Sequence, residues 1–137
     1  MSLVDAVKTI LDDGLPDSIP VFRGRVIGPT PERFVIVTAL SGTRTAETFN
    51  GDPDSRRSGI RLTVTATMPS GSSGSVDARA EWLVDQCERL LTGVRPVVAG
   101  QRVMALTHDL TRFMGADERL ASLQSAYYVA DFTTTTT

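Results

Sequence analysis

Residues 60–68 have the sequence Ile-Arg-Leu-Thr-Val-Thr-Ala-Thr-Met, in which apolar and polar side chains alternate without a break. Successive side chains of a β-strand point to opposite faces, so this pattern predicts a strand with one buried face. Its other face, made of an arginine and threonines, is expected to meet solvent or a polar partner. The rest of the chain should therefore supply neighbouring strands and a layer that covers one side of them.

Further strands are expected on either side of this stretch. Residues 33–40, Arg-Phe-Val-Ile-Val-Thr-Ala-Leu, have an unbroken apolar centre, which is typical of a strand covered on both faces. Residues 21–27 predict another strand, and the Gly-Pro-Thr-Pro sequence that follows them predicts a turn. Residues 97–107 and 123–134 predict the last two strands, joined by a polar link over 109–121.

Two amphipathic helices complete the pattern. Residues 3–13 place their apolar side chains on one helical face, and Ser2 and Asp5 have the spacing of a capping box. Residues 76–91 predict a second helix, which Ser75 can cap. The expected order is α-β-β-β-α-β-β, an α+β fold in which a mixed or antiparallel sheet is packed by two helices.

The composition excludes several classes of protein. The chain, 1–137, has the length of one domain, with 41% hydrophobic residues, 22% charged residues and a formal net charge of −2. This balance argues against a protein whose main task is to grip nucleic-acid phosphates. No apolar run is long enough to predict a membrane span, and the first residues lack the pattern of a secretory signal. The single cysteine, Cys87, excludes an internal disulfide and fits a reducing compartment.

The residue types that catalysis or metal binding would need are few. His108 is the one histidine, and its neighbour Asp109 could support it as a general base, but no nucleophile motif accompanies them. Cys87 lies on the apolar stripe of the second helix, where a cysteine is usually inert. Asp52 and Asp54 lack the spacing of a calcium loop. We therefore expect no enzyme activity and no catalytic, cofactor-binding or metal-binding residues.

Two segments have the character of contact surfaces. Residues 41–59 predict a long polar loop with no net charge, and loops of this length inside a compact domain are usually functional or disordered. Residues 133–137 are a run of five threonines, which we expect to form a C-terminal extension. Such a β-prone end either presents an edge that another chain can extend or is a frayed terminus.

The order of these segments resembles that of the tail terminator proteins of long-tailed, siphovirus-type bacteriophages. The matching segments are an opening helix at 3–13, a β-hairpin with Pro and Gly in its turn at 21–40, a long polar loop at 41–59, a half-buried strand at 60–68, a second helix at 76–91 and a closing strand pair at 97–132. The resemblance covers nearly the whole chain and lies in this arrangement, because the family has no catalytic signature to match.

The resemblance implies a structural role. Tail terminators form a hexameric ring that caps the completed tail tube, stops its polymerisation and provides the surface that joins the head. The implied partners are further copies of the chain in a homo-hexamer, the tail-tube protein and a head-completion or connector protein. DNA would pass through the ring without specific binding. The implied location is the head–tail junction of the virion, after synthesis in the host cytoplasm.

The same resemblance makes the loop 41–59 the expected contact with the tube or with a neighbouring subunit. Loop length and residue chemistry single out Arg44, Phe49, Arg56 and Arg57 as its candidate contact residues.

Three other hypotheses remain open at this point. The chain could be another head–tail connector or completion protein of the same phages, which the sequence separates poorly from a terminator. It could be a cellular α+β module that binds a small ligand between its sheet and helices. It could also be a small hydrolase that uses His108 and Asp109.

Overall fold

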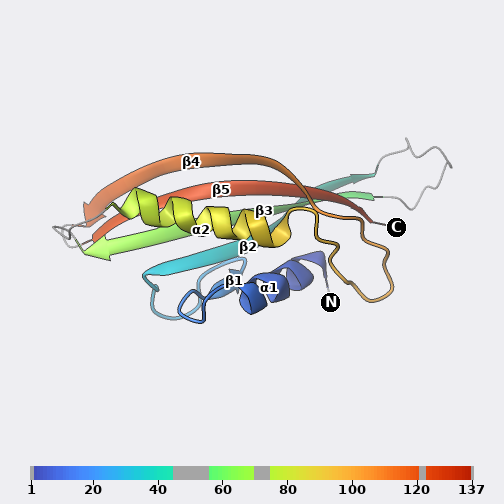
Figure 1. Ribbon diagram of the computed structural model, residues 1–137, viewed down its shortest axis with the longest axis horizontal. Helices are drawn as coiled ribbons and strands as arrows, with labels where there is room; N and C mark the ends of the chain where they lie inside the picture. The colour runs from blue at the N-terminus through green and yellow to red at the C-terminus, as the bar shows by residue number, and fades with distance from the viewer. Residues whose placement is uncertain (1, 45–55, 70–74, 121–122, 137) are drawn as a thin grey trace.

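The computed structural model describes residues 2–44, 56–69, 75–120 and 123–136. Two helices and five strands follow one another in the order that the sequence predicts, so the α+β class is confirmed (Figure 1). The elements are α1 (Leu3–Gly14), β1 (Val21–Arg23), β2 (Arg33–Arg44), β3 (Arg56–Pro69), α2 (Val76–Leu91), β4 (Thr107–Leu120) and β5 (Leu123–Thr136).

The five strands form one open sheet in the order β1-β2-β3-β5-β4. The pairs β2–β3, β3–β5 and β5–β4 are antiparallel, whereas the short strand β1 lies parallel to β2. The β-hairpin expected over 21–40 is therefore wrong. Residues 24–32 carry the chain back to the level at which β1 began, so that β2 runs in the same direction as β1. Gly24 and Gly28 in this connection have positive φ angles of 79° and 87°, which glycine adopts readily.

The middle of the sheet is formed by β3 and β5, which pair without interruption from Arg56 opposite Thr136 to Pro69 opposite Leu123. The alternation that predicted β3 is confirmed, because its apolar residues are buried and its threonines are half-buried. The C-terminal extension expected at 133–137 is wrong for residues 133–136, which belong to β5. They are β-prone and pair with residues 56–59 of β3, and Thr133 also pairs with Thr107 of β4.

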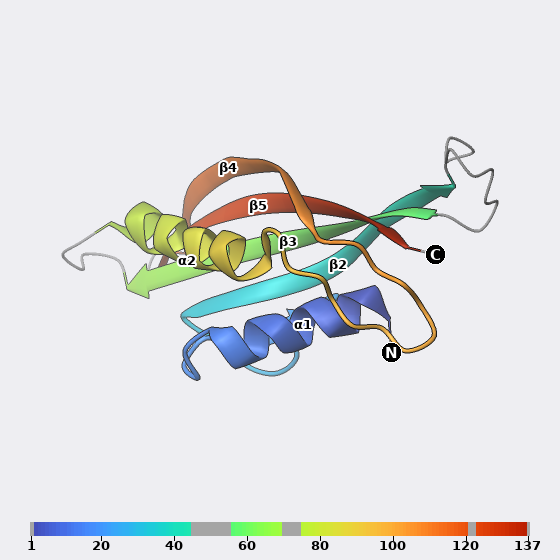
Figure 2. The ribbon, with the colours of Figure 1, turned by 45° about the vertical axis from the view of Figure 1, so that its right-hand side comes forward.

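Both helices cover the same face of the sheet. α1 packs over β1 and β2, and α2 packs over β3 and β5 (Figures 1 and 2). One apolar core joins the two helices to the inner face of the strands, and its largest fully buried side chains include Phe132, Leu11, Ile60, Leu62, Leu83 and Leu91. Within the described residues, no helix lies on the other face.

The helices begin where the sequence predicts. In α1, the Asp5 backbone N–H donates to Ser2 Oγ at 3.2 Å, and the Asp5 carboxylate accepts from Ser2, which completes the capping box. In α2, the Ala78 N–H donates to Ser75 Oγ at 3.2 Å. Each cap satisfies a backbone donor that the first turn of a helix would otherwise leave unpaired.

Two segments expected after α2 differ from the structure. Residues 97–107 do not form a regular strand but an irregular connection, in which Val103 forms one bridge with Thr136. The polar link expected over 109–121 is instead the edge strand β4. β4 takes this place because β5 offers a free side for pairing, and residues 92–106 bring the chain back from α2 to that side.

The long loop expected over 41–59 is wrong at both ends. Residues 41–44 continue β2, and residues 56–59 begin β3, with Thr43 opposite Arg57 and Arg44 opposite Arg56. An irregularity between Leu40 and Thr43 marks where the two strands shift register. Cross-strand pairing with β5 supports this part of β3 from its other side, which explains why strand structure extends into a polar stretch.

Candidate assembly surfaces

Three of the four residues singled out as contacts, Arg44, Arg56 and Arg57, lie where β2 and β3 pair at one end of the sheet. The structure brings the backbones of Arg44 and Arg56 opposite each other, and Arg57 follows on β3 with its side chain exposed. Phe49 lies outside the described residues. The backbones of three arginines are thus placed at one end of the sheet.

The face of the sheet that carries no helix is polar at its centre. Arg61 of β3 lies directly opposite Asp131 of β5, and its Nε and NH2 groups donate to the two carboxylate oxygens at 2.8 and 3.1 Å. The hydrogen bond from Arg61 to the Asp131 carboxylate raises the pKa of the guanidinium. Threonines line β3 beyond this pair. Apolar side chains share this face, because Thr63 lies between Ile36 of β2 and Val129 of β5. The face is therefore a mixed surface, in which a fixed ion pair and hydroxyl groups lie among apolar side chains.

Charge is divided between the two halves of the sheet, that is, between the strands β1, β2 and β3 and the strands β5 and β4. The strands β1, β2 and β3 contain six arginines and no acidic residue. The elements on the other side, α2, β4 and β5, contain eight acidic residues against four arginines. α1, which packs beside β1 and β2, carries three aspartates and one lysine, so that side keeps a net positive charge. The small net charge of the chain thus results from two sides of opposite sign.

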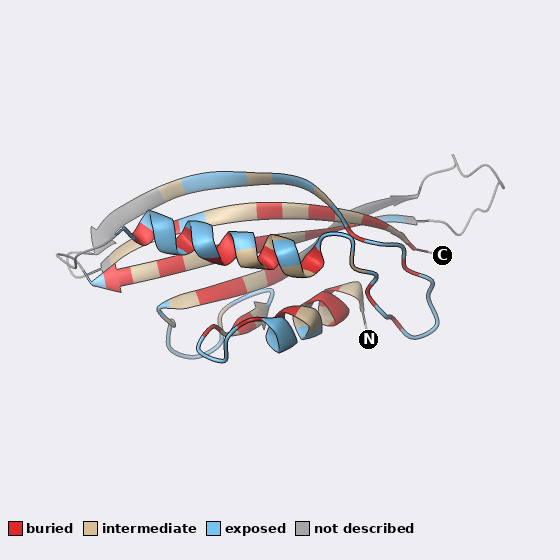
Figure 3. Cartoon of the chain, viewed as in Figure 1, coloured by how far each residue is buried: buried red, intermediate tan, exposed pale blue. Residues whose placement is uncertain are grey.

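The edge strand β4 exposes apolar side chains. Leu110, Phe113 and Met114 are 48%, 49% and 46% exposed, and the described middle of β4 is largely solvent-accessible (Figure 3). Phe113 pairs with Tyr128 and packs against its ring at a centroid distance of 5.1 Å, on the face covered by α2. Leu110 pairs with Asp131 and so lies on the opposite face. A further strand placed beside β4 would cover apolar groups on both faces of the sheet.

β4 is also irregular. Its register against β5 shifts between His108 and Leu110, between Phe113 and Gly115, and between Asp117 and Leu120. Such β-bulges bend an edge strand and limit the length over which another chain can pair with it. Between the first two shifts, the four residues Leu110–Phe113 remain in regular pairing.

A cavity of about 250 Å³ lies beside the opposite edge of the sheet, between the start of α1 and the strands β2 and β3. Its lining comprises Ser2, Leu3, Val4, Arg23, Ala39, Leu40, Ser58, Gly59 and Ile60. β1 pairs with β2 only as far as Val37, so β2 is unpaired on this side from Thr38 onward within the described residues. The cavity thus opens beside a free strand edge.

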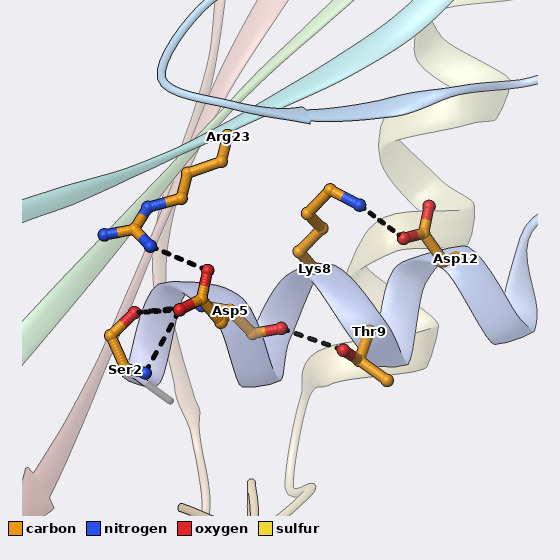
Figure 4. A network of polar contacts seen from close by, with 6 residues as sticks. All are labelled: Ser2, Asp5, Lys8, Thr9, Asp12 and Arg23. Atoms are coloured by element: carbon orange, nitrogen blue, oxygen red, sulfur yellow. Dashed lines mark hydrogen bonds and ion pairs between the residues drawn. The ribbon is translucent and has the colours of Figure 1, made fainter.

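Two residues of the cavity lining, Ser2 and Arg23, belong to a polar network at the start of α1 (Figure 4). The Ser2 backbone N–H and hydroxyl donate to Asp5 Oδ2 at 3.2 and 3.0 Å, and Arg23 donates to Asp5 Oδ1 at 2.8 Å. The hydrogen bonds from Ser2, followed by that from Arg23, lower the pKa of the Asp5 carboxyl. The network holds the Arg23 side chain against α1 and neutralises it.

The one histidine belongs to a small cluster that joins β4 to α2. His108 Nε2 lies 2.6 Å from Thr111 Oγ1 and 3.4 Å from Glu88 Oε1, and Thr111 donates its hydroxyl proton to Glu88. Because that proton is directed at Glu88, His108 must donate to the threonine and does not act as its base. Asp109, the partner considered from the sequence, instead accepts from Thr133 at 3.1 Å.

Within the part of the chain that the structure describes, the other reactive groups do not converge on a site. Cys87 is buried on α2, and burial raises the pKa of its thiol to about 12, which keeps it protonated and unreactive. No group of three or more His, Cys, Asp or Glu residues in the described ranges could hold a metal ion. None of the helices in these ranges has the length and apolar character needed to cross a membrane.

The apolar edge was not predicted from the sequence. Leu110, Phe113 and Met114 fall in the stretch expected to be a polar link, because the two-residue alternation of a strand is broken by the bulges. A signal was nevertheless present, since three large apolar residues within five positions are more than a solvated link needs.

Comparisons with known proteins inform the fold. No protein-family model and no curated protein sequence matches the chain. By contrast, 22 solved chains match its structure. One of them aligns over 98% of this chain and 96% of its own length, with a TM-score of 0.54 and 15% sequence identity. At this identity the similarity shows a shared fold from end to end.

Proposed function

We propose that the protein is a phage tail terminator: a structural protein, without catalytic activity, that forms a hexameric ring on the end of the tail tube. The ring would stop tube polymerisation and provide the surface that joins the head, at the head–tail junction of the virion. The arrangement of segments that resembles this family supports the proposal. The single observation that carries it is the opposite charge of the two sides of one sheet.

Charge division of this kind suits a ring. When copies associate head to tail, the arginine-rich side of one copy meets the acidic side of the next, and a rotation that closes produces a ring. An isologous dimer would instead place like charges against each other at each of these surfaces. The divided charge therefore favours a cyclic assembly over a two-fold dimer.

The site geometry gives less support to the other hypotheses. The cavity beside β2, at about 250 Å³, is smaller than the 300–1,000 Å³ that is usual for ligand pockets, which argues against a small-molecule binding module. The His108 cluster lacks the proton arrangement that a hydrolase needs. Another head–tail connector protein of the same phages remains the alternative, and its partner on the tube or head distinguishes it.

Two measurements test the proposal. Light scattering coupled to size exclusion should give the mass of six chains, either for the protein alone or after incubation with tail tubes. Electron microscopy of polymerising tail-tube protein should show tubes that stop growing when the protein is added. A chain that stays monomeric and neither binds nor caps tubes would exclude the terminator function, whereas binding to the head connector alone would favour the alternative.

The hairpin contact can be tested separately. Replacing residues 45–55 with Asn-Gly joins Arg44 to Arg56 through a two-residue turn that suits an antiparallel pair. If Phe49 and the neighbouring arginines form the tube contact, this variant keeps its fold and loses tube capping. The matched control, Arg102→Lys, changes an exposed arginine on the connection between α2 and β4, away from the hairpin, and should retain capping. Unchanged capping by the shortened variant would exclude the loop as the tube contact.

A further inference from the structure

We propose that copies of this chain associate through their sheet edges, with residues 110–113 of β4 pairing alongside the free edge of β2 on the next copy. The contact rests on the ring of the proposed function and names the surfaces that would form it. The partner of the apolar edge is a second copy of this chain, bound head to tail.

The strand that is added to the next copy, here called the donor, is the regular segment of β4. Leu110 and Phe113 are each about half exposed and lie on opposite faces of the sheet. A strand added beside them would cover both, because side chains of paired strands lie next to each other on each face. The bulges on either side restrict this pairing to four residues, which favours one specific partner over indiscriminate edge pairing.

The edge that receives this strand, here called the acceptor, is the part of β2 beyond Val37. The Val35 N–H donates to the Pro20 carbonyl, and the Val37 carbonyl accepts from the Gly24 N–H, so the backbone groups of these residues point toward β1. By strand alternation, those of Ala39 point to the same side, beyond the end of β1. An incoming strand can therefore bond to Ala39 and cover the cavity between Leu3, Val4 and Ile60.

Charge selects this pairing over the symmetric one. The acceptor lies in the three strands that contain six arginines and no acidic residue, although Arg23 and Arg61 already pair with Asp5 and Asp131. The donor lies among elements with twice as many acidic residues as arginines. Pairing of β4 with β4 in a two-fold dimer would bring two acidic sides together. Pairing of β4 with β2 brings opposite charges together. It leaves one β4 edge and one β2 edge unpaired at the two ends of a chain of copies, and the pairing of these two edges closes a ring.

Two variants, each blocking one side, test the contact. Ala39→Pro removes the N–H that points to the free edge and leaves the bonds between β2 and β3 in place. Leu110→Lys with Phe113→Lys places positive charge on the edge that would meet the arginine-rich side. The matched controls are Ala39→Ser, which keeps the N–H, and Val97→Lys, which puts a lysine at another exposed apolar position. Circular dichroism of each variant checks the fold.

The expected results follow from the head-to-tail geometry. Wild type and both controls self-associate in analytical ultracentrifugation, and each blocked variant alone is monomeric, with association weakened about tenfold or more. An equimolar mixture of the two blocked variants forms heterodimers, because each chain retains the surface that the other needs. Self-association of Ala39→Pro at wild-type strength, a mixture that stays monomeric, or a wild type that is monomeric at millimolar concentration would each overturn the inference.

A second measurement does not depend on the tolerance of these substitutions. Chains with Ala39→Cys and chains with Leu110→Cys, mixed and treated with a short thiol cross-linker, should join as mixed pairs, whereas either chain alone should not. The native Cys87 is buried and does not interfere. Cross-linking of Leu110→Cys chains to each other would show β4–β4 pairing and overturn the inference. Tube capping tests the proposed function independently, since a chain that caps tubes without this edge contact would keep that function and lose only the inference.

Discussion

The strands β5 and β4 are the two members of one antiparallel pair and are both 14 residues long, yet they differ in almost every other respect. β5 has a strand on each side, pairs with β3 in continuous register and buries Ala126, Ala130 and Phe132 completely. β4 has one partner, three register shifts and large apolar side chains that are about half exposed.

This difference shows what a second partner does to a strand. A strand enclosed on both sides must keep its two-residue alternation, because a slip of one residue would turn its buried side chains to the other face. An edge strand is free of this constraint and can bend through bulges. The regular strands thus build the core, while the irregular strand leaves surface for another molecule.

The largest predicted effect contrasts the phenylalanines of the two strands. Phe132→Ala on β5 should lower the free energy of unfolding by about 3–5 kcal/mol, because it empties a fully buried site. Phe113→Ala on β4 should lower it by about 1 kcal/mol, since that ring is half exposed and loses mainly its contact with Tyr128. Urea unfolding of the isolated variants measures both. Equal losses at the two positions would show that β4 is as much part of the core as β5.

The same contrast explains how much of the fold could be predicted from the sequence. Both helices, the strand β3 and the order of elements followed from periodicity and capping residues, because each of these elements is amphipathic and packs in a regular way. Residues 109–121 were predicted as a polar link, since extra residues at the bulges of β4 hide the strand period in the local sequence. The direction of β1 was also missed, because the path of residues 24–32 depends on tertiary packing.

The candidate site was predictable only in part. The polar stretch before β3 indicated a contact region, and its arginines do lie together at the hairpin tip. The charge division between the two sides of the sheet could not be seen in the linear sequence, because it depends on the strand order, which places β5 between β3 and β4. The free edge of β2 depends on how early β1 ends, which no local pattern specifies.

A smaller effect is expected at Gly59, where three central strands meet. A Cβ built at this position would lie 2.8 Å from the Cβ of Leu40, which cannot move without shifting the backbone of β2. Gly59→Ala should therefore reduce the free energy of unfolding by about 1–3 kcal/mol. Leu40→Gly removes the contact, so a double-mutant cycle should show favourable coupling between the two substitutions. Additive losses would mean that β2 adjusts freely, as an edge strand does.

The ion pair on the uncovered face should contribute less. Arg61→Met and Asp131→Asn, combined in a double-mutant cycle, should give a coupling energy of about 0.5–1 kcal/mol, because Arg61 remains partly exposed and salt screens the pair. Denaturant unfolding at low and high ionic strength measures this coupling, which should decrease with salt. A coupling of several kcal/mol would instead indicate that the uncovered face excludes water as the helix-covered face does.

The smallest effect is expected at the start of α1, beside the free edge of β2, and it depends on pH. The hydrogen bonds from Ser2, followed by that from Arg23, lower the pKa of the Asp5 carboxyl below its ordinary value of 3.8. Its contribution to stability is therefore present above the unfolded pKa and is lost as the pH falls through the folded pKa. Thermal unfolding between pH 7 and pH 2 should show wild type more stable than Asp5→Asn at neutral pH, with the difference shrinking in acid.

A matched substitution at the other end of the helix separates this local effect from a general charge effect. Asp13→Asn removes a carboxylate near the C-terminus of α1, where the helix dipole disfavours negative charge, so it should leave the neutral-pH stability unchanged or slightly raised. If Asp5→Asn behaved in the same way, Arg23 would not be held by the Asp5 carboxylate. Arg23 would then be available to an incoming acidic strand. The basic edge of the sheet would carry the charge of Arg23 in addition, which the contact with Asp5 otherwise neutralises.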